Sequence, residues 1–102
     1  MVLGTINFRG DKVEISTDKY RHGGGLCVRG ESLMGPYVFS MNLYGHPSTD
    51  VCSLGKYEFV LSHDILNIPG AEKELMDSGL FEDTGQRCGY GYCSNVPIWR
   101  VK

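Results

Sequence analysis

The segment of residues 67–99 constrains the fold of this chain more than any other part. Apolar residues between Ile68 and Met76 recur with helical spacing, which is typical of a short amphipathic helix. Asn67 is a favoured N-cap, and Gly79 readily adopts the left-handed conformation that ends helices. A Thr-Gly turn and a ribbon rich in glycine, tyrosine and cysteine follow. The segment therefore predicts one helix over about residues 68–78, followed by closing strands in which Trp99 or its alternate neighbours are buried.

The rest of the chain has the pattern of short strands joined by turns. The 102 residues include 14 glycines, and the apolar runs are short. Alternation of apolar and polar residues predicts strands at 2–8, 12–17, 26–29, 36–44, 56–61, 86–93 and 97–101. In the strand at 36–44, one face holds Tyr37, Phe39, Met41 and Leu43. In the strand at 56–61, one face holds Tyr57, Phe59 and Leu61. The prediction is an α+β fold: one small globular domain over residues 1–102, with a curved, mainly antiparallel β-sheet of about five to seven short strands and one α-helix packed on it.

The charge of the chain excludes a broad class of partners. Its formal net charge is -2, whereas proteins that bind nucleic acid directly carry clustered Lys and Arg. We find no signal peptide and no apolar run long enough to span a bilayer. We therefore expect a cytoplasmic protein that contacts neither nucleic acid nor membrane. In that setting the four cysteines are expected to be reduced thiols.

No catalytic or cofactor motif stands out. Cys88 and Cys93 are separated by four residues, at the loose edge of zinc-ligand spacing, and no second pair accompanies them. Reduced thiols are the expectation for these two cysteines, and a metal site is the open alternative. Residues 62–64 spell Ser-His-Asp, but catalytic triads are assembled from separate segments, so a polar turn before the helix explains them better. We expect no enzyme activity, metal or cofactor.

Candidate partner-binding residues fall in three groups, because tyrosines are enriched at interfaces and exposed acids can occupy a basic site. These are the polar loop residues Tyr44, His46 and Asp50, the acidic helix residues Glu72, Glu74 and Asp77, and the ribbon tyrosines Tyr90 and Tyr92.

The chain resembles a family of small bacterial domains of unknown function carried by conjugative elements, plasmids and phages. The matching residues are 67–72, 78–80, 84–85, 89–93 and 96–99, and residues 25–26 and 41–43 look like the family's earlier strand motifs. The chain departs from the family pattern at 62–64 and 86–88. The resemblance implies an α+β fold with a curved antiparallel sheet and one helix, and it implies no catalytic residues.

The mobile-element resemblance suggests an accessory protein that inhibits a host defence system, such as a CRISPR effector, by protein–protein binding in the host cell. The alternatives are a small-ligand protein that binds a nucleotide signal, and a structural or housekeeping module. A ligand site would need basic residues, for which Arg21, Arg29, Arg87 and Arg100 are the sources. The identity of the target and homodimer formation are left open by the sequence.

Overall fold

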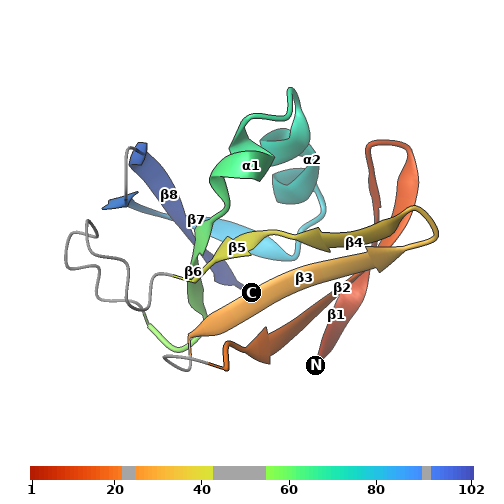
Figure 1. Cartoon of the computed structure of the whole chain (residues 1–102), viewed down its shortest axis with the longest axis horizontal. Coiled ribbons are helices and arrows are strands. Elements are labelled where there is room, and N and C mark those ends of the chain that lie inside the picture. The colour runs from red at the N-terminus through yellow and green to blue at the C-terminus, as the bar shows by residue number, and fades with distance from the viewer. Residues whose placement is uncertain (22–24, 43–54, 91–92) are drawn as a thin grey trace.

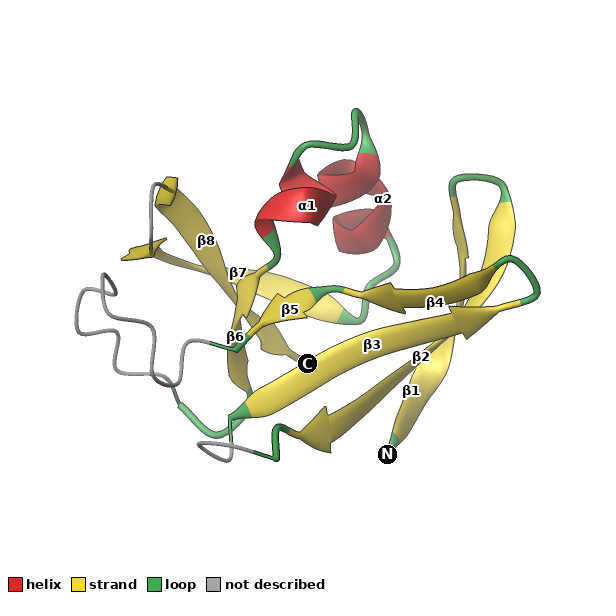
Figure 2. Cartoon of the chain, viewed as in Figure 1, coloured by secondary structure: helices red, strands yellow, loops and turns green. Residues whose placement is uncertain are grey.

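The computed structural model describes residues 1–21, 25–42, 55–90 and 93–102, with the side chains of 89–95 left out of the description. Its strands form two antiparallel sheets beneath a pair of short helices (Figures 1 and 2). Sheet A has the order β1 (Val2–Phe8), β2 (Asp11–Lys19), β3 (Leu26–Ser32), β4 (Gly35–Val38). Sheet B has the order β5 (Ser40–Met41), β6 (Glu58–Leu61), β8 (Cys93–Val101), β7 (Phe81–Tyr90). The helices are α1 (His63–Leu66) and α2 (Ala71–Asp77).

Sheet A follows the alternation of its sequence. Val13 and Ile15 of β2 are buried with Val28 of β3, whereas the polar residues between them face water. A two-residue turn joins β1 to β2, and Arg9 and Gly10 adopt positive φ angles of 55° and 79°. Such turns match the twist of paired strands. The expected strands at 2–8, 12–17 and 26–29 are therefore confirmed.

Phe39 is the point where the chain passes from sheet A to sheet B. Its N–H donates to the carbonyl of Val28 at 2.9 Å, and its carbonyl accepts from the N–H of Ser62 at 2.7 Å. The expected continuous strand at 36–44 is thus wrong, since β4 ends at Val38 and β5 begins a new sheet. Met41 lies beside a second apolar cluster rather than in the main core with Phe39.

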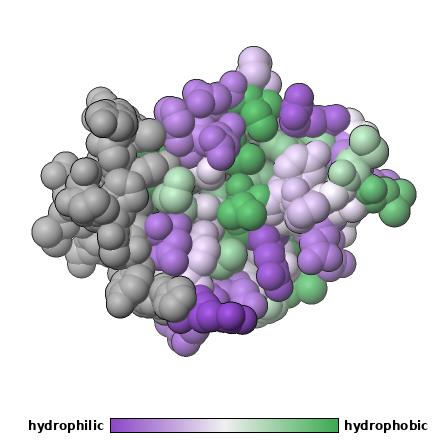
Figure 3. All heavy atoms as spheres, viewed as in Figure 1, coloured by the Kyte–Doolittle hydropathy of each residue, from purple (hydrophilic) through white to green (hydrophobic). Residues whose placement is uncertain are grey.

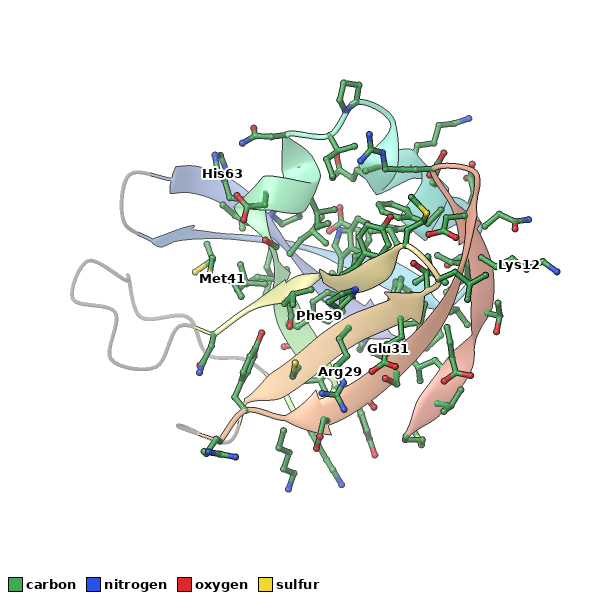
Figure 4. The ribbon with its side chains drawn as sticks, turned by 45° about the vertical axis from the view of Figure 1, so that its right-hand side comes forward. Lys12, Arg29, Glu31, Met41, Phe59 and His63 are labelled. Carbon is green, nitrogen blue, oxygen red and sulfur yellow. The ribbon has the colours of Figure 1, made fainter. Side chains whose placement is uncertain are left out.

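The main core fills the space between the two sheets and α2. Phe59, Phe81 and Trp99 of sheet B pack edge-on or tilted against one another there, and Figure 4 shows Phe59 behind the strands of sheet A. Gly30 of β3 leaves room for Phe39, because a Cβ at this position would lie 2.8 Å from the Phe39 ring. A smaller cluster covers the opposite face of sheet B and consists of Val60, Cys88, Val96 and Ile98.

The helical region differs from the prediction of one helix over 68–78. Asn67 is the C-cap of α1 rather than an N-cap, and α2 begins after Gly70. The reason is Pro69, which lacks an N–H and disfavours helical geometry in the residue before it. The expected polar turn at 62–64 instead opens α1. Gly79 has a φ of 78°, which confirms its role as the helix stop.

The α+β class is confirmed, but the finer description is wrong. Among the described residues, eight strands form two sheets and two helices cover them, in place of one sheet of five to seven strands with one helix. The expected strand at 56–61 begins only at Glu58, so Tyr57 precedes β6 and is half exposed. No helix in the described ranges is long and apolar enough to cross a membrane.

The cysteines differ from the expectation in one respect. Cys27 is a free thiol, as expected, whereas Cys88 is buried and disulfide-bonded. Its partner lies beyond the described side chains. The expectation of reduced thiols follows from the expected cytoplasmic setting, which does not determine which sulfurs approach in space. Because disulfides persist chiefly in oxidising compartments, the disulfide at Cys88 does not support the expected cytoplasmic setting.

Candidate functional site

The structure describes three of the eight predicted partner-binding side chains. Glu72, Glu74 and Asp77 lie on the exposed side of α2, as the helical spacing predicts. The loop residues Tyr44, His46 and Asp50 lie outside the described residues. The same applies to the side chain of Tyr90 and to Tyr92.

The acidic face of α2 is partly engaged within the molecule. An Oε2 atom of Glu74 accepts a hydrogen bond from the backbone N–H of Arg9 at 2.8 Å, which ties the β1–β2 turn to the helix. Asp77 forms an exposed ion pair with Lys73 at 3.7 Å. Of the three acids, Glu72 alone makes no polar contact with a described residue. The helix is therefore a weaker candidate for a docking face than its charge suggests.

The turn between β3 and β4 presents two large apolar side chains to water. Leu33 is fully exposed, and Met34 keeps 81% of its surface accessible. The Ser32 hydroxyl donates to the carbonyl of Gly35 at 3.0 Å and accepts from the N–H of Met34 at 3.1 Å. These bonds fix the turn, so the two side chains project from a defined backbone. Figure 3 shows apolar atoms protruding at the right-hand end, where Figure 1 places this turn.

The exposed apolar residues continue along β4. Among the described strands, β4 is the edge of sheet A and pairs with β3 alone. Pro36 and Val38 are exposed on its outer side, and Val38 is 54% accessible, whereas Tyr37 and Phe39 turn toward the core. We call these four outward residues the apolar tip surface: Leu33, Met34, Pro36 and Val38. Contiguous exposed apolar residues are a common mark of an interaction site.

The open face of sheet A borders this surface with charge. Glu14 of β2 and Glu31 of β3 are direct cross-strand partners and are both exposed. Figure 4 shows Glu31 and Arg29 on the same side of β3. Arg29 pairs with Asp18 at 3.7 Å, and neither glutamate forms an ion pair with a described residue. Two like charges directly opposite each other destabilise a sheet slightly, and Lys12 and Arg29 flank this pair on the same face.

Sequence reasoning did not identify the apolar tip surface. A local signal existed, because Leu33 and Met34 stand between Ser32 and Gly35, two residues typical of turns. Two large apolar residues at the centre of a turn have no core to enter. The cross-strand position of Glu14 and Glu31 depends on register, which one sequence does not show.

The arginines proposed for a small-ligand site are mostly engaged. Arg87 makes two bonds to the Asp83 carboxylate, at 3.0 and 3.2 Å, and these hold the pKa of Asp83 below its usual range. The Arg100 Nε donates to Glu82 at 2.6 Å, and Arg29 pairs with Asp18. Among the residues that the structure describes, no three His, Cys, Asp or Glu side chains gather as a metal site.

One polar network, centred on the buried Ser40 hydroxyl, links sheet A to β5. The Ser40 hydroxyl oxygen accepts from the N–H of Val28 at 2.9 Å and shares a 2.6 Å hydrogen bond with the Tyr20 hydroxyl. Burial raises the pKa of Tyr20 to about 12. The network joins the end of β2 to β5, and we assign it a structural role because every described contact links one strand to another.

No family model, no curated protein and no solved structure matches this chain.

Proposed function

We propose that this protein is a non-enzymatic binding module that inhibits another protein by docking on it through the apolar tip surface. The observation that carries the proposal is the pair Leu33 and Met34, which a hydrogen-bonded turn holds in water at the end of a rigid hairpin. Each exposed apolar side chain of this size gains about 1.5–3 kcal/mol when it is buried.

The shape of the tip favours a protein partner. A convex hairpin end fits a concave apolar pocket, and a few anchor side chains in such a pocket commonly supply most of the binding energy. Pro36 and Val38 extend the contact along the edge of β4. Occupation of a functional pocket on the partner would then block its normal ligand.

We further propose that the target is a host defence protein, such as a CRISPR effector. This rests on the resemblance to small proteins of mobile elements, which is an argument by association. The small-ligand alternative loses support, because Arg29, Arg87 and Arg100 are already paired with carboxylates.

A plating assay tests the proposal. Bacteria that carry an active defence system and express this chain are challenged with phage, and the efficiency of plating is measured. The double variant Leu33→Ser/Met34→Ser should restore defence. Its thermal stability should be unchanged, because both side chains are already in water.

The matched control is Val2→Ser, which removes an exposed valine from β1. It should inhibit like wild type. A double variant that inhibits fully would refute the docking surface. A wild-type chain that protects phage from no defence system tested would refute the defence role.

A further inference from the structure

We infer that the apolar tip surface enters a partner pocket that is apolar at its centre and bordered by lysine or arginine side chains. This inference rests on the proposed function and adds the chemistry of the partner. It comes from the position of Glu14 and Glu31, which face each other across β2 and β3 beside the tip.

Glu31 adjoins the tip in both sequence and space, and Glu14 lies opposite Glu31, one strand further from β4. Glu31 precedes Leu33 by two residues on β3, and its cross-strand neighbour on β4 is Pro36, a member of the apolar tip surface. A pocket that encloses Leu33 and Met34 thus brings its rim against both carboxylates. Cations on that rim would relieve the like-charge repulsion, which makes docking more favourable than it would be for an isolated apolar tip.

The neighbouring cations of this chain do not neutralise the pair. Arg29 is held by Asp18 at 3.7 Å, on the side of Glu31 away from the tip. Lys12 is the cross-strand partner of Asn7, and Figure 4 shows its side chain extending outward from β2. Lys12 makes no polar contact with a described residue. Lys12 lies two residues before Glu14 on the same exposed face of β2, so the border of the tip on β2 and β3 holds this cation together with two carboxylates, and none of the three forms an ion pair with a described residue.

The same charges disfavour other occupants. An anionic lipid surface would repel the glutamates, although exposed Leu and Met side chains can enter a bilayer. A second copy docked tip to tip would bring four carboxylates together. A protein pocket with a basic rim is the occupant that satisfies both the apolar residues and the charges.

The decisive variant is Glu31→Lys, because it separates binding from stability. A lysine opposite Glu14 replaces a repulsive cross-strand pair with an attractive one, so the melting temperature should rise. Binding should nevertheless weaken by about ten-fold or more, because the new cation faces the basic rim. A variant that is more stable and binds less cannot be explained by misfolding.

The probe is p-benzoylphenylalanine placed at position 34 of the full chain, which crosslinks the protein bound at the tip in cells. The captured protein is purified, and its affinity for wild type, Glu31→Lys and Glu14→Gln is measured at low and high salt. Asp64→Lys is the matched control, since it reverses an exposed acid on α1. The control should bind like wild type, and wild-type binding should weaken with salt.

The outcomes separate the two proposals. Equal affinity of Glu31→Lys and wild type, with loss of binding in Leu33→Ser/Met34→Ser, would overturn the basic rim and leave the docking surface intact. No adduct from position 34, or undiminished binding by the double variant, would overturn both. Sedimentation of wild type with vesicles of phosphatidylcholine and phosphatidylglycerol, lost in the double variant, would replace the protein partner with a membrane.

Discussion

At the scale of single residues, the hydroxyl of Ser40 shows how a buried polar atom is accommodated. It accepts from the N–H of Val28 and shares its second bond with Tyr20. Each partner comes from a different strand or strand end, so the loss of any one leaves a buried polar group unpaired. An unpaired buried group of this kind costs about 1–3 kcal/mol.

We predict a stability change at alkaline pH that depends on Tyr20. Because burial raises the pKa of Tyr20 from 10.0 to about 12, the neutral phenol stabilises the fold fully below pH 10, and this contribution is lost as the pH rises from 10 to 12. Tyr20→Phe should therefore be less stable than wild type at neutral pH, and the difference should shrink through that window. Urea unfolding of both proteins at several pH values measures this difference in stability. A Tyr20 phenol that titrates near pH 10 in the folded protein would contradict the prediction.

At the scale of elements, β7 is interrupted by an irregularity that its own side chains hold in place. The register with β8 shifts between Asp83 and Arg87, where Gly85 has a φ of 83°. Asp83 accepts from the Gly85 N–H at 2.8 Å and from the Arg87 guanidinium. The Thr84 hydroxyl donates to the carbonyl of Ile98 at 2.7 Å. The bulge is thus a defined feature rather than a frayed strand.

Asp83→Asn should weaken this element. The substitution keeps an acceptor for Gly85 and removes the charge that Arg87 binds, so we expect a loss of roughly 0.5–1 kcal/mol near pH 7 for this partly exposed pair. Because the pKa of Asp83 is lowered in the fold, its contribution is present above the ordinary carboxyl pKa and is lost as the pH falls below it. The unfolding curves of wild type and Asp83→Asn should therefore differ at pH 7 and converge in acid. Lys19→Gln, which removes an exposed charge on β2 whose side chain makes no polar contact with a described residue, is the control and should be neutral at both.

At the scale of the whole molecule, Phe39 makes the two sheets one unit. Its backbone bonds to both, and its ring packs edge-on against Phe8 with centroids 5.4 Å apart. The tie between Glu74 and Arg9 adds a second link, from α2 to sheet A. The apolar tip surface is therefore mounted on a hairpin that is anchored at its far end by the shared core.

Phe39→Ala should destabilise both sheets together, by about 3–5 kcal/mol. The reason is the cavity left in a core to which both sheets contribute. Hydrogen exchange should speed up for the amides of β2 and of β6 alike. Val38→Ala, which shortens the exposed neighbour, should have little effect. Faster exchange confined to sheet A would show that the sheets are separate units.

The sequence predicted the features that depend on local pattern. Alternation identified the buried faces around Val13 and Ile15, and a glycine after an amphipathic run identified the helix stop at Gly79. The transition at Phe39 was missed for a physical reason. In-out alternation continues through this residue while its hydrogen-bond partners change from one sheet to the other. The pattern of side chains does not record that change.

The candidate site was predicted less well. The helical spacing placed the acids of α2 on the exposed face. It did not predict that Glu74 accepts a hydrogen bond from the Arg9 N–H, because the two residues are far apart in sequence. The apolar tip surface depends on a hairpin whose turn falls on Leu33 and Met34, and the glutamate pair depends on strand register. Both are products of tertiary geometry.

Pro36 has a consequence for the fate of this protein at high concentration. An exposed apolar edge strand is a template on which further strands add without limit, as in amyloid. Pro36 stands on that edge and has no N–H to donate, so an incoming strand finds an interrupted ladder. The chain can thus expose an apolar hairpin to a specific partner and still resist fibril growth from the same edge.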